Sequence, residues 1–218
     1  MLLIGRDLSP FVRRTAITLL ELGLGFERRK LAAQPDAEEV SRFNPLRRVP
    51  ALQLDDGDML VDSNAVTDFA LDHAGTLGGA SAAQAQRLLP ATGLPRRQVL
   101  QVVGLALGVM EKAVASSYEV RLRPAEKVHQ PWLENITDQT GKGLQALESL
   151  AGDARIAGRH WLCGDDLSLA DICAVVAYDF TTIVLGELTV QAAPQYLAEL
   201  SQAANQRAAF NATRWQGD

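Results

Sequence analysis

The spacing of apolar and polar positions differs between the two parts of the chain. The first part shows patterns typical of both strands and helices, and the later part shows helical patterns only. A short apolar strand is predicted over residues 2–5, and a second strand over residues 26–31. Between them, apolar residues recur at helical spacing over residues 11–22. Ser9 and Pro10 precede this stretch. Since serine is a preferred N-cap and proline is favoured in a first turn, the helix is expected to begin there.

A β-hairpin is predicted over residues 49–61, because two apolar runs flank an Asp-Asp-Gly turn. The proline of Val49-Pro50 stands at the first residue of a strand, where its missing N–H is tolerated. After the second strand, Asp62-Ser63 precedes a helical pattern, so both residues can cap a helix and offer N–H donors to an anion. A hairpin with polar backbone at both ends indicates a recognition site for a peptide-like ligand.

The remaining patterns divide the chain into two domains and a linker. A short helix is predicted over residues 35–43 and a longer one over residues 63–73. Residues 1–75 then follow the order strand, helix, strand, helix, strand, strand, helix, which is typical of an α/β sheet with helices on its faces. Residues 76–95 are rich in Gly, Ala and Ser and contain two prolines, so an interdomain linker is predicted there. Residues 96–218 are predicted to be all-helical.

The helical domain contains three long patterns and shorter pieces near its end. The first two long patterns cover residues 96–120 and 126–150. Ser168 and Asp171 form an S-x-x-D capping box at the start of the third, residues 169–184. The centre of this third helix is almost wholly apolar, which predicts the buried core helix of the domain.

Composition excludes several classes of function. With 218 residues, 47% of them hydrophobic and 22% charged, the chain can bury a core. A net charge of -5 without a basic stripe argues against nucleic acid as a partner. No uninterrupted apolar run approaches the roughly 18 residues that span a membrane, and the N-terminus does not resemble a signal peptide. No G-x-S-x-G, P-loop or complete G-x-G-x-x-G motif supports a hydrolase, an NTPase or a dinucleotide-binding protein. Cys163 and Cys173 lack metal spacing, as do the three histidines, so we expect no metal and a reducing, cytoplasmic setting.

Four segments together resemble the cytosolic glutathione S-transferases, in particular serine-type, bacterial-like members. They are SPFVRR at 9–14, NPLRRVPAL at 44–52, VDS at 61–63 and GDDLSLADI at 164–172. The resemblance covers essentially the whole chain. It implies a thioredoxin-like α/β domain followed by an all-α domain, and a cytoplasmic homodimer engaged in detoxification. It also implies glutathione as co-substrate, with no other cofactor.

The same resemblance implies roles for the matching residues in binding glutathione. Ser9 would hydrogen-bond the glutathione sulfur as the catalytic residue. The backbone of Val49, aimed by a cis Pro50, would pair with the cysteinyl part of the tripeptide. Asp62 and Ser63 would hold the γ-glutamyl end.

Other positions depart from the family pattern or are assigned by position only. Arg48 stands where many members carry a lysine near the glycyl carboxylate, so the charge is kept. Arg47 replaces the glycine usual just before it, and Asp62 replaces a more common glutamate. Phe11 and Tyr118 are candidates for the pocket of a small electrophilic second substrate, which the sequence does not identify. The alternatives are that Phe11 packs in the core and that Tyr118 lies at a solvated helix end.

The proposed chemistry is energetically reasonable without a general base. A free thiol has a pKa near 8.5, so mostly thiolate at neutral pH requires roughly 2.7 kcal/mol of preferential stabilisation of the anion. A hydroxyl donated to a charged acceptor contributes about 1.5–3 kcal/mol, and a helix N-terminus about 0.3–1 kcal/mol. The prediction is thiolate stabilisation followed by nucleophilic attack, with no covalent enzyme intermediate.

Alternative interpretations remain open for individual residues. By local pattern alone Ser9 is a helix cap, and only the resemblance favours a catalytic role. Asp62 and Ser63 are equally ordinary at the start of a helix. Arg13 and Arg14 are expected to be solvated.

Alternatives also remain open for the function of the whole protein. A glutathione-binding or ligand-binding protein with little transferase turnover would share this fold, since function depends on the site. Thiol-dependent peroxide reduction or isomerisation would keep catalysis and change the reaction.

Overall fold

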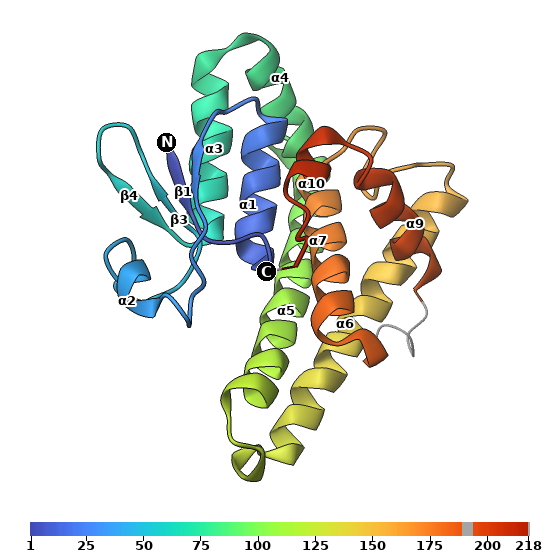
Figure 1. The fold of residues 1–218 in the computed structure, drawn as a ribbon. Helices are drawn as coiled ribbons and strands as arrows, with labels where there is room; N and C mark the ends of the chain where they lie inside the picture. The colour runs from blue at the N-terminus through green and yellow to red at the C-terminus, as the bar shows by residue number, and fades with distance from the viewer. Residues whose placement is uncertain (189–193, 218) are drawn as a thin grey trace. The chain divides into compact units, whose positions relative to one another are not determined.

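The computed structural model describes residues 1–188 and 194–217, and the chain falls into two units (Figure 1). The first unit contains Met1–Ala91 together with the chain from Asn205 onward, and the second is Thr92–Ala204. The described residues form a small four-stranded mixed sheet and are otherwise mostly helical. This confirms the predicted class, a thioredoxin-like α/β part and an all-α part.

The sheet of the first unit has the strand order β2-β1-β3-β4. Its strands are β1 (Leu2–Ile4), β2 (Glu27–Arg29), β3 (Ala51–Gln53) and β4 (Met59–Val61). β1 pairs in parallel with β2 and antiparallel with β3, and β3 pairs antiparallel with β4 as the predicted hairpin. In the register, Ile4 lies opposite Ala51, which lies opposite Val61. One end of β1, β3 and β4 therefore forms a single row across the sheet.

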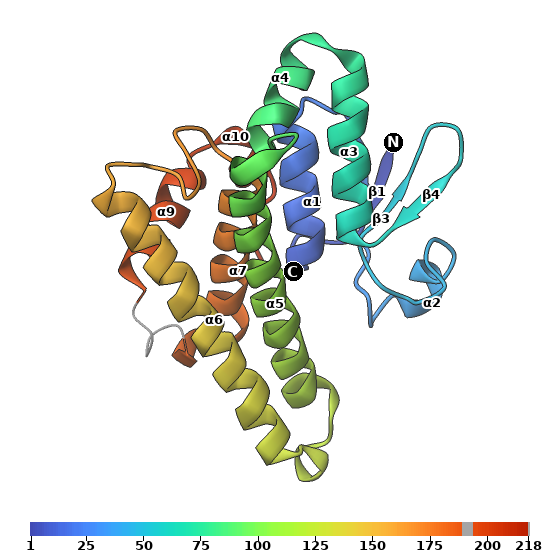
Figure 2. The ribbon, with the colours of Figure 1, turned by 180° about the vertical axis from the view of Figure 1, so that it is seen from behind.

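The helices of the first unit are α1 (Pro10–Glu21), α2 (Ala37–Val40), α3 (Ser63–Leu77), α4 (Gly79–Leu88) and α10 (Ala208–Ala212). Both ribbon views place α1 and α3 side by side next to the sheet (Figures 1 and 2). Val12 and Ile17 of α1, like Val66 of α3, are fully buried, so each helix turns an apolar face inward.

The segment 76–95 differs from the linker expected there, because half of it is helix α4, which packs against α3. Five of the ten α4 residues are Ala or Leu, and both residue types favour a helix, alanine most strongly. Gly78 and Gly79 adopt φ of 72° and 58°, which allows the chain to break α3 and start α4 at once. The Gly-Ala-Ser composition therefore marks a turn between two helices.

The end of the chain also differs from the expected domain limits, because the residues from Asn205 belong to the first unit. The guanidinium of Arg207 makes two hydrogen bonds to the Glu21 carboxylate, at 3.0 and 2.7 Å. The Oδ1 atom of Asn205 accepts from Arg13 at 2.8 Å. These polar contacts hold the segment that carries α10 against α1, and the local helical pattern contains no signal for them.

The described helices of the second unit are α5 (Gly93–Leu122), the 3-10 turn η1 (Ala125–Lys127), α6 (Gln130–Ile156), α7 (Leu169–Val184) and α9 (Gln195–Ala204). α7 has the predicted bounds, and its central residues are fully buried, so it is the core helix of this unit. A Cβ at Gly143 of α6 would lie 2.4 Å from the Val109 side chain of α5. Glycine is needed there because the two long helices approach closely.

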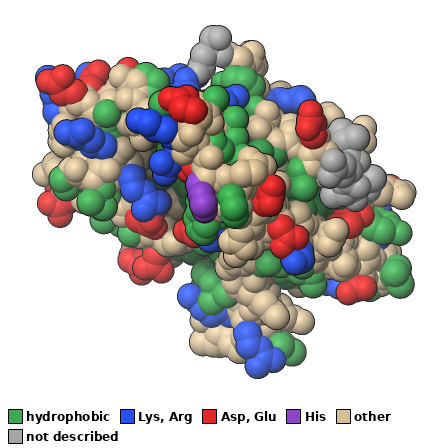
Figure 3. Space-filling model, turned by 90° about the horizontal axis from the view of Figure 1, so that it is seen from below, with side chains coloured by type: hydrophobic (Ala, Val, Ile, Leu, Met, Phe, Trp, Pro, Cys, Tyr) green, Lys and Arg blue, Asp and Glu red, His purple; other side chains and the backbone are tan. Residues whose placement is uncertain are grey.

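Among the described residues, α5 alone is long and apolar enough to cross a membrane by length and composition. However, 44% of its most apolar stretch is buried, and it lies against both α6 and α7. Core helices of soluble proteins can have the same length and composition, and we interpret α5 as a core helix. The face in Figure 3 carries interspersed acidic, basic and apolar side chains, which is usual for a water-facing surface.

The capping box predicted at the start of α7 is confirmed as a buried hydrogen-bond cluster. The carboxylate of Asp171 accepts from the Leu162 N–H at 2.7 Å and from the Ser168 N–H and hydroxyl at 2.8 and 2.7 Å. Burial raises the pKa of Asp171, and these hydrogen bonds oppose that effect. The carboxylate ties the loop before α7 to its first turn.

We predict that Asp171→Ala destabilises the protein by about 3 kcal/mol, because it leaves three buried donors without an acceptor. The control is Asp138→Ala, which removes a carboxylate that is 56% exposed and paired with Lys142. An exposed pair of this kind is worth at most about 1 kcal/mol. Urea unfolding measures both, and equal losses in the two variants would contradict the structural role of Asp171.

Candidate functional site

Three loops that carry the predicted glutathione-binding residues lie at the same end of strands β1, β3 and β4. Ile4, Ala51 and Val61 form a row across β1, β3 and β4. The chain after Ile4 leads to Ser9, the residues before Ala51 are Val49 and Pro50, and Asp62 and Ser63 follow Val61. We call this set of three loops the edge site. The loops of Ser9 and Ser63, more than fifty residues apart in the sequence, thus meet through strand pairing.

Close packing under the edge site depends on Gly5. Its φ is 129°, a conformation that side chains other than glycine rarely adopt. A Cβ there would lie 2.4 Å from the Val12 side chain and 3.0 Å from the Val49 Cβ. The loop from β1, the start of α1 and the loop before β3 therefore approach as closely as the absence of a side chain permits.

Ser9 caps α1 and keeps its hydroxyl proton available. Its backbone is extended, and its Oγ accepts from the Val12 N–H at 3.4 Å, which is long for such a bond. The Ser9 side chain is half-buried, and among the described residues it has no other hydrogen-bond partner. Because the hydroxyl acts only as an acceptor in the cap, it can still donate to an anion.

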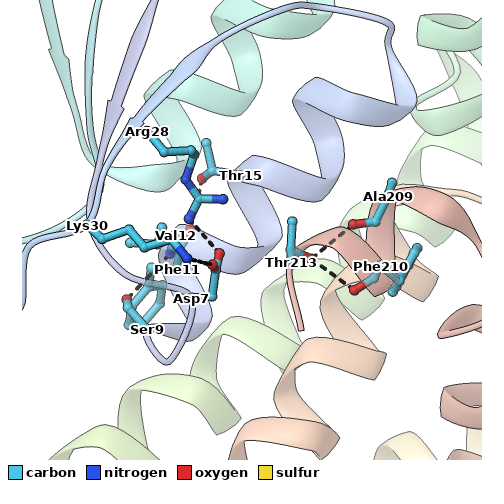
Figure 4. Close-up of polar contacts among 10 residues, drawn as sticks. All are labelled: Asp7, Ser9, Phe11, Val12, Thr15, Arg28, Lys30, Ala209, Phe210 and Thr213. Carbon is cyan, nitrogen blue, oxygen red and sulfur yellow. Dashed lines mark hydrogen bonds and ion pairs between the residues drawn. The ribbon is translucent and has the colours of Figure 1, made fainter. Parts of the chain in front are cut away.

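A carboxylate that is paired with two cationic side chains precedes Ser9 in the same loop (Figure 4). Asp7 is 9% exposed and lies 2.5 Å from Arg28 and 3.8 Å from Lys30, both at or next to β2. These cations balance a negative charge two residues from Ser9 that would otherwise oppose a nearby anion. The Arg28 bond also fixes the loop to the neighbouring strand.

The loop before β3 has the cis bond that the resemblance implied, between Val49 and Pro50. Asn44 is buried; its side-chain amide donates to the Arg48 carbonyl at 2.9 Å, and its Oδ1 accepts from the Leu46 N–H at 3.0 Å. Sequence reasoning quoted Asn44 within a motif but assigned it no role. The structure shows that it holds this loop in shape.

The arginine pair of this loop is exposed, and its backbone explains the family's glycine. Arg47 adopts φ of 54°, in the left-handed region that glycine occupies at no steric cost. Arg47 takes up this conformation, so the loop keeps its turn. Arg48 is exposed, as a residue that reaches a ligand carboxylate must be.

The start of α3 holds the third group of predicted residues. Asp62 has φ 76° and ψ 137°, a strained conformation for a residue with a side chain, and its carboxylate accepts from the Asn64 N–H at 2.7 Å. Ser63 is 3% exposed, and its Oγ accepts from Arg14 at 2.9 Å. Both act as helix-start residues, and their roles toward glutathione remain predictions.

The expectation that Arg13 and Arg14 are solvated is wrong, since they are 5% and 2% exposed. Arg13 donates to Asn205 of the C-terminal segment, and Arg14 donates to Ser63. Their partners lie far away in the sequence, which is why the local pattern favoured solvent.

The two residues proposed for the second-substrate pocket belong to different units. Phe11 is half-buried on α1 in the first unit, and Tyr118 is 40% exposed on α5 in the second. Their role in a pocket remains a prediction. No group of three or more metal-ligating side chains occurs within the described part of the chain.

The cysteines do not belong to the edge site. Cys163 and Cys173 both lie in the second unit, and Cys173 is fully buried. Burial, reinforced by the nearby Asp171 carboxylate, raises the pKa of Cys163 to about 11. A thiol of this kind is protonated at neutral pH and is a poor nucleophile.

Comparison with protein families decides the affiliation of the chain. Residues 8–73 match the model "Glutathione S-transferase, N-terminal domain", and residues 130–203 match "Glutathione S-transferase, C-terminal domain". The chain belongs to the glutathione S-transferase family. The first match includes Ser9 and the edge-site residues Val49, Pro50, Asp62 and Ser63.

Relatives of this transferase-family protein include one protein compared by sequence and two compared by structure. The uncharacterized GST-like protein YibF of Escherichia coli K12 is 29% identical over 189 residues, 85% of this chain and 86% of its own. A glutathione S-transferase from Methylobacterium radiotolerans in complex with glutathione sulfonate is 27% identical, with a TM-score of 0.84 and coverage of 100% and 97%. A family member from Pseudomonas fluorescens Pf-5 with bound glutathione is 27% identical, with a TM-score of 0.77 and coverage of 98% of both chains.

We predict that Arg28→Met destabilises this transferase-family protein by about 3–5 kcal/mol, because the variant leaves the buried Asp7 carboxylate without its closest partner. The matched control is Lys30→Met. Lys30 is 68% exposed and lies 3.8 Å from the same carboxylate, so its loss should cost about 1 kcal/mol or less. Chemical denaturation of both variants tests this, and a larger loss for Lys30→Met would reverse the assignment.

A second prediction concerns Cys163, studied in a Cys173→Ser variant that leaves one thiol. With a pKa of about 11, Cys163 should react with iodoacetamide at pH 8 about a hundredfold more slowly than free glutathione, since far less of it is thiolate. The rate should rise steadily up to about pH 11. Mass spectrometry follows the modification, and a rate that levels off near pH 8 would contradict the raised pKa.

Proposed function

We propose that this protein binds glutathione at the edge site and stabilises its thiolate for attack on a small electrophile, as a glutathione transferase. The observation that carries the proposal is that the loops of Ser9, Val49 and Ser63 all join the sheet at the same end of its strands. Support also comes from the Methylobacterium and Pseudomonas relatives, whose structures hold glutathione sulfonate and glutathione.

Each loop of the edge site would contact a different part of the tripeptide. The backbone of Val49, next to its cis bond with Pro50, would pair with the cysteinyl residue. The Ser63 hydroxyl and the N-terminus of the 15-residue helix α3 favour an anion, which suits the carboxylate of the γ-glutamyl group. Arg48 is exposed and cationic, as the glycyl carboxylate requires.

Ser9 would stabilise the thiolate by donating its hydroxyl proton to the sulfur. Such a bond is worth about 1.5–3 kcal/mol, and the N-terminus of α1 adds about 0.3–1 kcal/mol. The sum meets the roughly 2.7 kcal/mol needed to lower a thiol pKa by two units.

A second candidate is a glutathione-binding protein without transferase turnover. The observation in its favour is that Ser9 already serves as the cap of α1, which accounts for the serine without any catalysis. Peroxide reduction or isomerisation at the same thiolate are further alternatives that change the second substrate only. The ionisation state of bound glutathione separates the binder from the three enzymes.

Because the chain belongs to this family, we extend the proposal to its oligomeric state, its cellular location and its biological role. We expect a homodimer in the cytoplasm that acts in detoxification, with Phe11 and Tyr118 at the pocket of the electrophile. Equilibrium sedimentation tests the dimer directly. A monomer at micromolar concentration would remove that part of the proposal and leave glutathione binding intact.

The central prediction concerns bound glutathione, whose thiolate absorbs in the ultraviolet. We expect the wild-type complex to ionise about two pH units below free glutathione. In Ser9→Ala the thiolate pKa should rise by one unit or more, and turnover near neutral pH should fall tenfold or more, with little change in glutathione affinity. The measurement is an ultraviolet titration combined with calorimetric binding.

The control for this experiment is Thr15→Val, which removes a buried hydroxyl of α1 that is bonded to the Phe11 carbonyl. It should leave the thiolate pKa unchanged. Saturable binding without a lowered pKa in the wild type would favour the non-catalytic binder. If glutathione does not bind at all, the edge site has only a structural role and the proposed function is wrong.

A further inference from the structure

Arg14 is a buried cation that the proposed chemistry does not yet use. It lies on α1, five residues after Ser9, and is among the largest fully buried side chains of the protein. Arginine is almost never fully buried unless its donors are satisfied, because removing its charge from water is costly. A residue retained at this cost next to a candidate site requires a specific explanation.

The contacts of Arg14 run from α1 to the start of α3. One terminal nitrogen donates to the Ser63 Oγ at 2.9 Å and to the Asn64 Oδ1 at 3.2 Å. Asn64 in turn donates its backbone N–H to the Asp62 carboxylate at 2.7 Å. Arg14 therefore fixes the residues that are expected to hold the γ-glutamyl end of glutathione.

The direction of the Arg14–Ser63 hydrogen bond determines what Ser63 can do. A guanidinium has donors only, so the Ser63 oxygen must be the acceptor in this bond. Its proton then points elsewhere, and within the described residues no side chain or carbonyl accepts it. Since a buried donor without an acceptor is unfavourable, the hydroxyl is prepared to donate to an acceptor on a ligand.

We propose that Arg14 is a positioning residue that orients the Ser63 hydroxyl as a hydrogen-bond donor to the α-carboxylate of the γ-glutamyl group. The proposal rests on the proposed function and specifies how the edge site selects its ligand. Arg14 acts through Ser63 and need not touch the ligand. Its consequence is a preference for ligands that carry a carboxylate at this end.

A purely structural role makes a different prediction. If Arg14 only ties α1 to α3, its replacement lowers stability and weakens all ligands of the edge site to the same extent. If it orients Ser63, replacement weakens ligands with the γ-glutamyl carboxylate selectively. The ratio of two affinities therefore separates the roles, whereas one affinity alone does not.

The experiment compares glutathione with 4-aminobutyryl-cysteinylglycine, which lacks only that carboxylate, by calorimetry on the full chain. We expect the wild type to prefer glutathione at least tenfold. In Arg14→Met the affinity for glutathione should fall tenfold or more while the analogue changes less than twofold. In a double-mutant cycle, Ser63→Ala should then have little further effect.

The matched control is Arg13→Met, because Arg13 is the neighbouring buried arginine and donates to Asn205. It should lower stability and keep the tenfold preference. If Arg14→Met does not fold, Arg14→Lys is measured instead. A single ammonium lacks the planar fork of donors, so the preference should fall at least threefold.

A folded Arg14 variant that retains the wild-type preference overturns the inference. A wild type that binds both ligands equally well also overturns it, while the proposed function stands. A wild type that binds neither ligand contradicts the proposed function itself, so the two failures are distinguishable.

Discussion

The candidate site depends on one row of strand pairing, in which Ile4, Ala51 and Val61 lie opposite one another. Each of these residues is the strand end next to a site loop, so backbone hydrogen bonds bring three distant segments to one edge. Gly5 lets these segments close up, because a side chain there would collide with Val12 and Val49. The relative positions of the site loops therefore depend on the strand pairing of the sheet and on the glycine at position 5.

Buried charges join the loops to this framework. Asp7 is held by Arg28 of β2, and Arg14 crosses from α1 to Ser63 and Asn64 at the start of α3. Such contacts add specificity of arrangement at a cost in desolvation, which favours their use where geometry matters. In this molecule they lie beside the loop of Ser9 and the loop of Ser63, which we propose bind the sulfur and the γ-glutamyl group of glutathione.

The site residues serve the fold and the expected chemistry at the same time. Ser9 and Ser63 begin helices α1 and α3, where exposed N–H groups already favour negative charge. Each hydroxyl accepts one hydrogen bond from the protein, Ser9 from Val12 and Ser63 from Arg14, and keeps its proton for another acceptor. The two hydroxyls proposed to bind an anion thus belong to residues that already serve the start of a helix.

The sequence by itself determined the features that depend on neighbours along the chain. The cap at Ser9, the hairpin that ends at Val61 and the Ser168–Asp171 box follow from local hydrogen bonding and hydrophobic period, so the sequence alone predicts them. The tertiary structure decided what depends on distant partners. It buried Arg14 against Ser63, placed the chain from Asn205 beside α1, and made residues 79–88 a helix packed on α3. Periodicity shows which face of an element is apolar. Only the folded structure shows which distant group each polar side chain contacts.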